Sequence, residues 1–186
     1  DWFHAIRIDD EYACFCETEY VIGKGHRNIA FAAGSLKEDG VMQKRFMGYR
    51  RALKKNGIPY SDRFLFENLV SYESGAETAR RIAGSDLGIT AVVATADILA
   101  IGLLSGFYRL GISVPEEISV IGFDGLEETE YTTPGLTTMK QPISRKGELA
   151  VDLLIENIEN PGMERVDEIL NVRLIERGSV RETACE

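Results

Sequence analysis

The sequence predicts an α/β fold with three layers, in which helices cover both faces of a doubly wound parallel sheet. Short segments such as Ile29–Ala33 and Ala91–Ala94 are apolar and uncharged, which is typical of strands that are buried on both faces. Longer segments with helical periodicity follow them, for example residues 41–56 after the first strand. Because strands and helices alternate with short connections, neighbouring strands are expected to be parallel.

Length and composition indicate a folded protein. The 186 residues suffice for one domain or for two small lobes, and 44% apolar with 27% charged residues is an ordinary globular composition. No apolar run approaches the roughly 20 residues that cross a bilayer, and the first residues lack the features of a signal peptide. We therefore expect a cytoplasmic chain without a membrane partner. The formal charge of −9 and the absence of a concentrated basic stripe argue against DNA binding by this chain alone.

The first part of the chain has clear start and stop signals. Residues 6–8 resemble the end of a strand, and the following helix, over 10–22, ends at Gly23 and Gly25, as helices often do at glycine. The elements expected next are a strand over 29–33, a helix over 41–56 that stops at an Asn-Gly pair, a strand over 64–66, a helix over 71–83 with a glycine beyond it, a strand over 91–94, a helix over 97–110 and a strand over 119–123.

After residue 124 the alternation is interrupted. Residues 127–130 form at most one helical turn, and 132–138 is a crossing segment that contains proline and glycine. An extended stretch over 139–142, a helix over 144–160 with apolar residues along one face, and a last strand over 168–175 are expected to follow. The interruption indicates a boundary between two lobes.

The helix over 97–110 is apolar almost all round. A helix of this kind is buried on more than one side, either in a crowded interior or between the sheet and another subunit. We favour the second alternative, because a small core has little room for a central helix. The expected homodimer interface combines this helix with the region of a later tyrosine, and its residues are Leu99, Leu103, Leu104, Tyr108 and Tyr131.

The strand over 119–123 stops abruptly at Asp124. Ligands of open parallel sheets bind beyond the carboxyl ends of the strands, so this carboxylate is a candidate ligand contact. The alternative is that Asp124 caps the turn or the short helix that follows, a role for which aspartate is well suited.

Other reactive side chains indicate no chemistry. Cys14, Cys16 and Cys185 are an odd, scattered set, which fits ordinary packing in a reducing compartment better than disulfides or a metal site. His26 lies between a helix and a buried strand, where a structural turn is more natural than a catalytic base. The sequence has no glycine-rich phosphate loop, nucleophile elbow or clustered metal ligands, so we expect neither an enzyme nor a cofactor.

Six segments resemble a known family in order and in register. They are GHRNIA at 25–30, RFMGY at 45–49, ATADILAIG at 94–102, VPEEISVIGFD at 114–124, LTTMKQP at 136–142 and RGS at 177–179. Together they resemble the effector-binding core of the lactose repressor and galactose repressor (LacI/GalR) family of bacterial transcription regulators. The resemblance implies a fold similar to type I periplasmic sugar-binding proteins, with a ligand between two lobes.

The resemblance also implies a division of the chain. Residues 1–8 would end the N-terminal lobe, 9–139 would form the C-terminal lobe, 140–167 would return to the N-terminal lobe, 168–180 would be the return strand of the C-terminal lobe, and 181–186 a tail. The family's helix-turn-helix DNA-binding domain and the first half of its N-terminal lobe have no counterpart. We therefore expect a fragment with one lobe largely complete and the other partial, in which operator DNA is a partner only through the absent domain.

The resemblance assigns effector contacts to particular residues. Arg45 matches the family's effector-binding arginine, although from sequence alone a surface ion pair is the simpler interpretation. Asp124 matches the effector-binding acid, which can accept from two sugar hydroxyls. Weaker assignments, each of which could equally be a core residue, are Val70 at an often aromatic position, Tyr72 as a substitute ring, Ala96 where a polar residue is common, and Ile143 on the cleft wall.

The function implied is sensing of a small polar effector, most often a sugar, by a dimeric regulator. A periplasmic sugar-binding protein of a transport system has the same fold and is the alternative. A sugar hydrolase is a third class, but acid pairs such as Glu116 and Glu117 are more natural as solvated surface than as a catalytic dyad.

Overall fold

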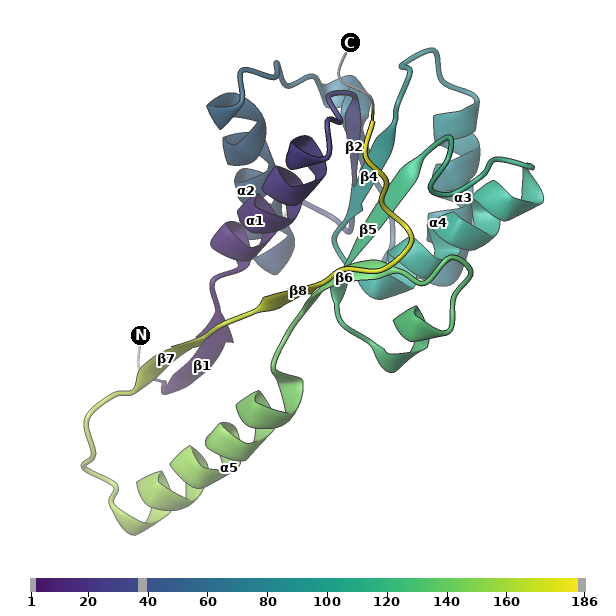
Figure 1. The fold of residues 1–186 in the computed structure, drawn as a ribbon. Helices are drawn as coiled ribbons and strands as arrows, with labels where there is room; N and C mark the ends of the chain where they lie inside the picture. The colour runs from purple at the N-terminus through teal and green to yellow at the C-terminus, as the bar shows by residue number, and fades with distance from the viewer. Residues whose placement is uncertain (1–2, 37–39, 184–186) are drawn as a thin grey trace.

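The computed structural model describes residues 3–36 and 40–183, and it contains two sheets of different size (Figure 1). The smaller sheet pairs β1 (Ala5–Ile8) with β7 (Asp167–Leu170). The larger sheet has the strand order β3–β2–β4–β5–β6–β8. Its strands are β2 (Ile29–Ala33), β3 (Leu65–Glu67), β4 (Ala91–Ala94), β5 (Ser119–Asp124), β6 (Thr137–Lys140) and β8 (Arg173–Ile175).

Helices cover both faces of the larger sheet. Helices α1 and α2 pack together on one face and α3 and α4 on the other, which gives three layers (Figure 1). Their bounds are α1 (Asp10–Gly23), α2 (Val41–Lys55), α3 (Tyr72–Ala83) and α4 (Asp97–Arg109). All strand pairs of this sheet are parallel except β6 with β8, which is antiparallel. The predicted three-layer α/β fold is confirmed.

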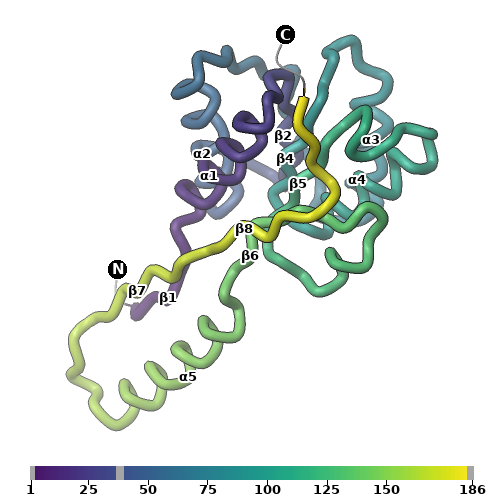
Figure 2. Tube along the Cα trace, viewed as in Figure 1, coloured from purple at the N-terminus to yellow at the C-terminus, as the bar shows by residue number. Residues whose placement is uncertain are grey.

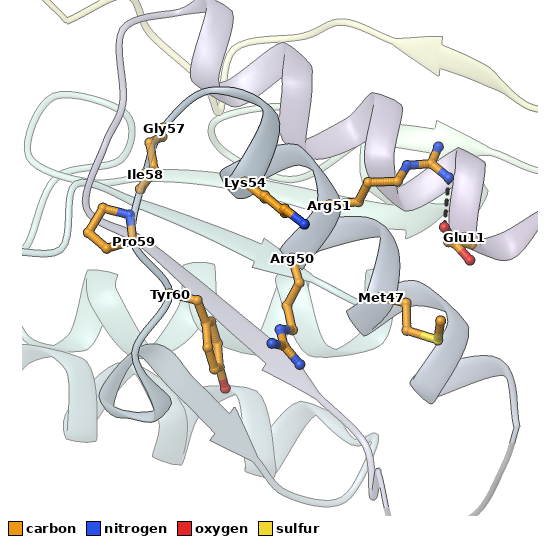
Figure 3. A pocket seen from close by; sticks show the side chains of 9 residues that line it. All are labelled: Glu11, Met47, Arg50, Arg51, Lys54, Gly57, Ile58, Pro59 and Tyr60. Carbon is orange, nitrogen blue, oxygen red and sulfur yellow. Dashed lines mark hydrogen bonds and ion pairs between the residues drawn. The ribbon is translucent and has the colours of Figure 1, made fainter.

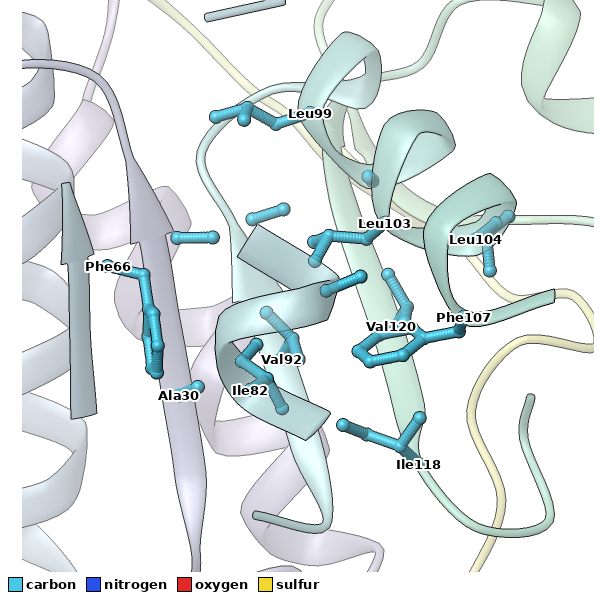
Figure 4. Packing of buried hydrophobic residues seen from close by; sticks show 14 of the residues in the cluster. Ala30, Phe66, Ile82, Val92, Leu99, Leu103, Leu104, Phe107, Ile118 and Val120 are labelled. Carbon is cyan, nitrogen blue, oxygen red and sulfur yellow. The ribbon is translucent and has the colours of Figure 1, made fainter. Parts of the chain in front are cut away.

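The core between the sheet and helices α3 and α4 explains the apolar sequence of α4. Alternate residues of the central strands, such as Val92 and Val120, point to this side and meet Leu103 and Phe107 (Figure 4). Fully burying a side chain of this size stabilises the fold by about 1.5–3 kcal/mol. Leu99, Leu103 and Leu104 are all buried here within one chain, and their assignment to a dimer interface stays a prediction. The crowded-interior alternative accounts for their burial.

The core on the other face is built around aromatic rings. Phe31 of β2 stacks on Tyr49 of α2 with 4.8 Å between ring centroids, and Phe46 and Tyr60 complete the group. The Tyr49 hydroxyl donates to the carbonyl oxygen of Ile29 at 2.8 Å, which satisfies its one buried polar group. These contacts fix α2 against the sheet and thereby fix the position of the residues on its first two turns.

The small sheet and α5 (Ile143–Glu159) form a second unit beside the first (Figure 1). Helix α5 has no buried residue among those described, because it packs on only two strands. The predicted single strand over 168–175 was wrong. It is two strands, and the chain passes from β7 in the small sheet to β8 in the large one, as the yellow trace in Figure 2 shows.

Two of the expected structural roles are clear in the fold. The buried ring of His26 contacts the Thr90 hydroxyl at 3.0 Å through Nδ1 and the Arg181 carbonyl at 3.2 Å through Nε2, and burial lowers its pKa. Cys14 is buried and Cys16 is partly buried, both as free thiols, whereas Cys185 lies outside the described residues. None of the helices described is long and apolar enough to cross a membrane.

Candidate functional site

The candidate site lies where the carboxyl ends of the central strands meet the first turns of three helices. Asp124 is the last residue of β5, and β6 ends beside it because Asp124 pairs with Lys140. Asp10 opens α1, Arg45 lies on the second turn of α2, and Asp97 opens α4. Parallel strands bring these segments to one edge of the sheet, which is where open α/β folds bind ligands.

Arg45 is a buried cation that is held from several directions. Only 4% of the residue is exposed. Its Nε donates to Asp10 Oδ1 at 2.9 Å, one terminal nitrogen donates to the Thr95 carbonyl at 2.5 Å, and the guanidinium lies 3.6 Å from the centre of the Phe123 ring. The surface ion pair considered from sequence is therefore wrong, since the pair with Asp10 is internal. A guanidinium fixed in this way loses little further freedom when it binds a ligand.

Asp124 faces Arg45 across 3.8 Å, measured from a terminal guanidinium nitrogen to Oδ1. The same oxygen accepts a hydrogen bond from the side-chain amide of Gln141 at 2.7 Å, and 25% of the Asp124 side chain remains exposed. Burial raises the pKa of this carboxyl, while the Arg45 cation opposes the rise. The site thus presents an acceptor that is partly desolvated and still open to a ligand.

The loop after Asp124 is held by Asp97. One carboxylate oxygen of Asp97 accepts from the backbone N–H groups of Gly125 and Leu126, each at 2.7 Å, and the other accepts from the Thr138 hydroxyl at 2.6 Å. A turn-capping Asp124 would bind the Leu126 N–H, which Asp97 holds, and the helical turn Glu127–Glu130 begins after Leu126 with no side-chain cap, so the capping alternative for Asp124 was wrong. Burial raises the pKa of Asp97 to about 6, with Asp124 adding to the rise and the hydrogen bonds opposing it.

Each residue of the motif Gly122-Phe123-Asp124 helps to position the side chains of the site. A side chain at Gly122 would collide with the Asp97 carboxylate, so the glycine makes room for it. Phe123 supplies the ring under the Arg45 guanidinium. Asp124 has a φ of 121°, a backbone conformation that non-glycine residues rarely adopt and that costs about 1–3 kcal/mol. The conformation directs the chain into the loop that Asp97 binds.

Glu17 is a second buried acid near the site. It is fully buried on α1, and neither carboxyl oxygen has a nitrogen or oxygen partner among the described residues. Burial raises its pKa well above the usual range, the Arg45 cation opposes this, and Asp97 and Asp124 reinforce it. The surroundings of Glu17 therefore favour its protonated form.

The four weaker predicted contacts stand at or shortly before the start of a helix. Val70 is exposed on the loop before α3, and Ala96 is the buried residue that precedes α4. Tyr72 lies with Ile101 in a hollow on the outer side of α3 and α4. Ile143 is exposed at the first position of α5. No hydrogen bond or ion pair in the described chain joins any of the four to Asp124 or Arg45, so their assignment stays a prediction, whereas those two face each other at 3.8 Å.

Sequence reasoning missed three residues that shape the site. They are Asp10, Asp97 and Gln141. Gln141 and Asp97 stand inside segments that carry the family resemblance, so the motifs contained the signal. Asp10 was visible only as one of two acids that begin a helix. Their partners are 17 to 41 positions away in the sequence, and local pattern does not identify such partners.

Comparison with known proteins places this arrangement in a family. A model described as a periplasmic binding protein-like domain matches residues 18–180, which is most of the chain. The chain belongs to the periplasmic-binding-protein-like domain family. Within the family its relatives are LacI-type regulators, so the resemblance found in the six sequence segments is confirmed.

Three relatives illustrate the match. The catabolite control protein A of Priestia megaterium is 35% identical over 81% of this chain and 45% of its own length. The ribose operon repressor of Escherichia coli strain K12 is 35% identical over 87% of this chain and 49% of its own. A LacI family transcriptional regulator from Enterococcus faecium with bound ribose is 30% identical, with a TM-score of 0.89 over 97% of this chain and 66% of that one. The chain spans about half the length of the curated relatives that it matches.

Proposed function

We propose that this chain is the effector-sensing part of a bacterial transcriptional regulator and that its effector is a sugar. The observation that carries the proposal is the pairing of a fixed donor, Arg45, with an open acceptor, Asp124, at the carboxyl edge of the sheet. A relative named as a ribose operon repressor, and a similar regulator with bound ribose, support the same assignment. These names favour a regulator over the transport protein that was the alternative.

The chemistry of the pair suits hydroxyl groups. An ionised carboxylate accepts from two adjacent hydroxyls of a sugar, and a guanidinium donates to hydroxyl or ring oxygens with fixed geometry. The Gln141 amide orients one oxygen of Asp124, which leaves the other for ligand. Because Arg45 and Asp124 are partly or wholly removed from water, each hydrogen bond to them is stronger than at an exposed surface.

In the proposal, effector binding regulates the protein by shifting the equilibrium between arrangements of its two units. A ligand that binds one arrangement of the two units more tightly than another shifts their equilibrium by the difference in binding free energy. In the proposal, operator DNA is contacted by another part of the regulator, in keeping with the formal charge of −9 of this chain. We further propose a homodimer. Its contact would include Tyr108 and Tyr131, which are 84% and 75% exposed.

The proposal is tested by calorimetry with D-ribose and a panel of other mono- and disaccharides. Arg45→Ala and Asp124→Asn are each expected to weaken binding of the responding sugar by about 2–5 kcal/mol. Arg80→Ala, which removes an exposed arginine paired with an acid on α3, is the matched control and should leave affinity unchanged. Thermal melting of each variant verifies that it folds. Unchanged affinity in both site variants, or no binding of any sugar to the unsubstituted chain, contradicts the proposal.

A further inference from the structure

A pocket on the far side of α2 has no role in the site described above. It lies between the second half of α2 and the segment after it, and it encloses about 660 Å³ (Figure 3). Its apolar lining comes from Met47, Ile58, Pro59 and Tyr60. Cations and one acid complete the wall, and these are Arg50, Arg51, Lys54 and Glu11. The pocket therefore combines an apolar floor with a positively charged rim.

The charge of α2 contrasts with that of the chain. The helix has six cationic residues and no acidic one, although the whole chain has a formal charge of −9. The cations are Lys44, Arg45, Arg50, Arg51, Lys54 and Lys55. A positive helix on an acidic protein attracts anionic partners to one face while the rest of the surface repels them.

Two of the three cations that line the pocket have no acidic partner among the described residues. Arg45 is neutralised by Asp10 inside the protein, and Arg51 pairs with Glu11 at 2.6 Å on the pocket wall. Lys55 pairs with an acid of α1. Within the part of the chain that the structure describes, Arg50 and Lys54 have no carboxylate within 4.0 Å.

The simplest explanation of basic residues at the end of a helix is that they complement its dipole. This accounts for Lys54 and Lys55, which lie in the last turn. It does not account for Arg50, which lies one turn earlier with its guanidinium 4.9 Å from the centre of the Tyr60 ring (Figure 3). Nor does it account for the hollow beside these cations, in which Met47 is left half exposed.

We propose that this pocket binds an acidic segment of a partner protein, with an apolar side chain of the segment in the hollow and carboxylates on Arg50 and Lys54. The two cations are one helical turn apart, about 6 Å along the axis. Acidic residues two positions apart in an extended segment are separated by about 6.6 Å, which matches this spacing. The two cations thus match two carboxylates on the same side of an extended segment.

A small phosphate compound fits the pocket less well. Proteins bind compact phosphates with converging backbone N–H groups, most often at the first turn of a helix. This pocket lies against the second half of α2, where the carbonyl end of the helix repels an anion close to the backbone. The long side chains of Arg50 and Lys54 place their charges away from that end, which suits a ligand lying across the rim.

The surface is separate from the effector site and from the proposed dimer contact. Helix α2 covers the face of the sheet opposite to α3 and α4, and Tyr108 lies on α4 (Figure 1). Arg45 is buried near the start of α2, whereas the α2 side chains that line the pocket, at positions 47, 50, 51 and 54, are exposed. A partner bound to the pocket would therefore leave both of the other surfaces free.

The test uses a fluorescein-labelled peptide of about a dozen residues in which glutamate alternates with leucine, with fluorescence anisotropy as the readout. We expect the unsubstituted chain to bind it and the affinity to fall as salt rises from about 50 to about 300 mM. The double substitution Arg50→Ala and Lys54→Ala should weaken binding about tenfold or more. The control, Lys44→Ala with Lys55→Ala, removes the same charge from the same helix outside the pocket and should change affinity less than about twofold.

Several outcomes overturn the proposal. They are failure of the unsubstituted chain to bind the peptide, equal binding of a peptide with glutamine in place of glutamate, and an equal loss in the control variant. Heparin binding with the same dependence on Arg50 and Lys54 would indicate a general polyanion surface, and displacement of the peptide by millimolar inorganic phosphate would indicate a small-anion site. The salt and glutamine measurements need no variant, and melting temperatures show that the variants fold.

Discussion

Substitution of Asp97 by asparagine is expected to stabilise the protein at neutral pH, although it changes a buried residue with three hydrogen bonds. Burial raises the pKa of Asp97 from 3.8 to about 6, roughly 2 pKa units or about 3 kcal/mol at 1.36 kcal/mol per unit. Between these two values the folded state holds a proton that the unfolded state has released. Stability from this group is therefore fully present below pH 3.8 and is lost as pH rises through about 6.

Asparagine removes the charge and keeps most of the contacts. Its amide oxygen can accept from the N–H groups of Gly125 and Leu126, and its NH₂ group can donate to the Thr138 hydroxyl oxygen. Asp97→Asn should match the unsubstituted chain near pH 4 and exceed its free energy of unfolding by up to about 3 kcal/mol near pH 7. Asp97→Ala leaves the Leu126 N–H without a partner and the Gly125 N–H with only its 3.3 Å bond to the Thr138 hydroxyl, and it should lose about 1–3 kcal/mol at every pH.

Urea denaturation followed by far-ultraviolet circular dichroism, at intervals from pH 4 to pH 8, measures these differences. The informative quantity is the difference in unfolding free energy between Asp97→Asn and the unsubstituted chain, because the other titrating groups cancel in it. A difference that stays constant with pH refutes the reasoning. An asparagine variant as unstable as the alanine variant at pH 7 also refutes it, since the ionised carboxylate would then stabilise the loop more than its burial costs.

Three further predictions concern the core and the proposed assembly. Burial raises the pKa of Glu17, and Glu17→Gln removes this acid. The free energy of unfolding of Glu17→Gln, measured in urea, should therefore exceed that of the unsubstituted chain by an amount that grows as pH rises above 4.5. A difference that does not change with pH contradicts this. Gly48→Ala forces α2 away from the backbone of α1 and should lower the free energy of unfolding by about 1–3 kcal/mol. Gly147→Ala has open space on α5 and should raise the free energy of unfolding by up to about 1 kcal/mol. Equal melting temperatures of the two variants would disprove the packing explanation. Tyr108→Glu with Tyr131→Glu should convert a dimer to a monomer in analytical ultracentrifugation, and a monomeric unsubstituted chain at high concentration would rule out the dimer.

The order of strands and helices in the large unit was predictable because its strands are buried on both faces. Ala91–Ala94 is the clearest example, as all four residues are buried and neither face of the strand meets water. Apolar continuity of this kind occurs in few other settings, and the helices between the strands have capping or glycine signals. The local sequence was therefore enough to predict most of the strands and helices of the large unit.

The sequence was least informative where the outcome depends on what lies next to an element. The apolar surface of α4 has the same periodicity whether it packs on a neighbouring helix or on a second subunit, and only the structure shows that Leu103 is covered by its own chain. The last strand is apolar on both sides of residues 171–172, so its division between two sheets left no local signal. In the site, Arg45 and Asp124 could be predicted from motifs, but the hydrogen bonds of Asp97 join segments far apart in sequence.

The left-handed backbone at Asp124 lowers the stability of the fold, whereas its carboxylate serves the proposed ligand contact. Glycine adopts a φ of 121° with little strain, so Asp124→Gly would relax the backbone while deleting the carboxylate that faces Arg45. Selection for stability alone would favour glycine at this position, and selection for binding would retain aspartate. A chain that keeps the acid here accepts a less stable fold in exchange for the proposed ligand contact, and any thermostabilised variant of this protein should be checked first at this residue.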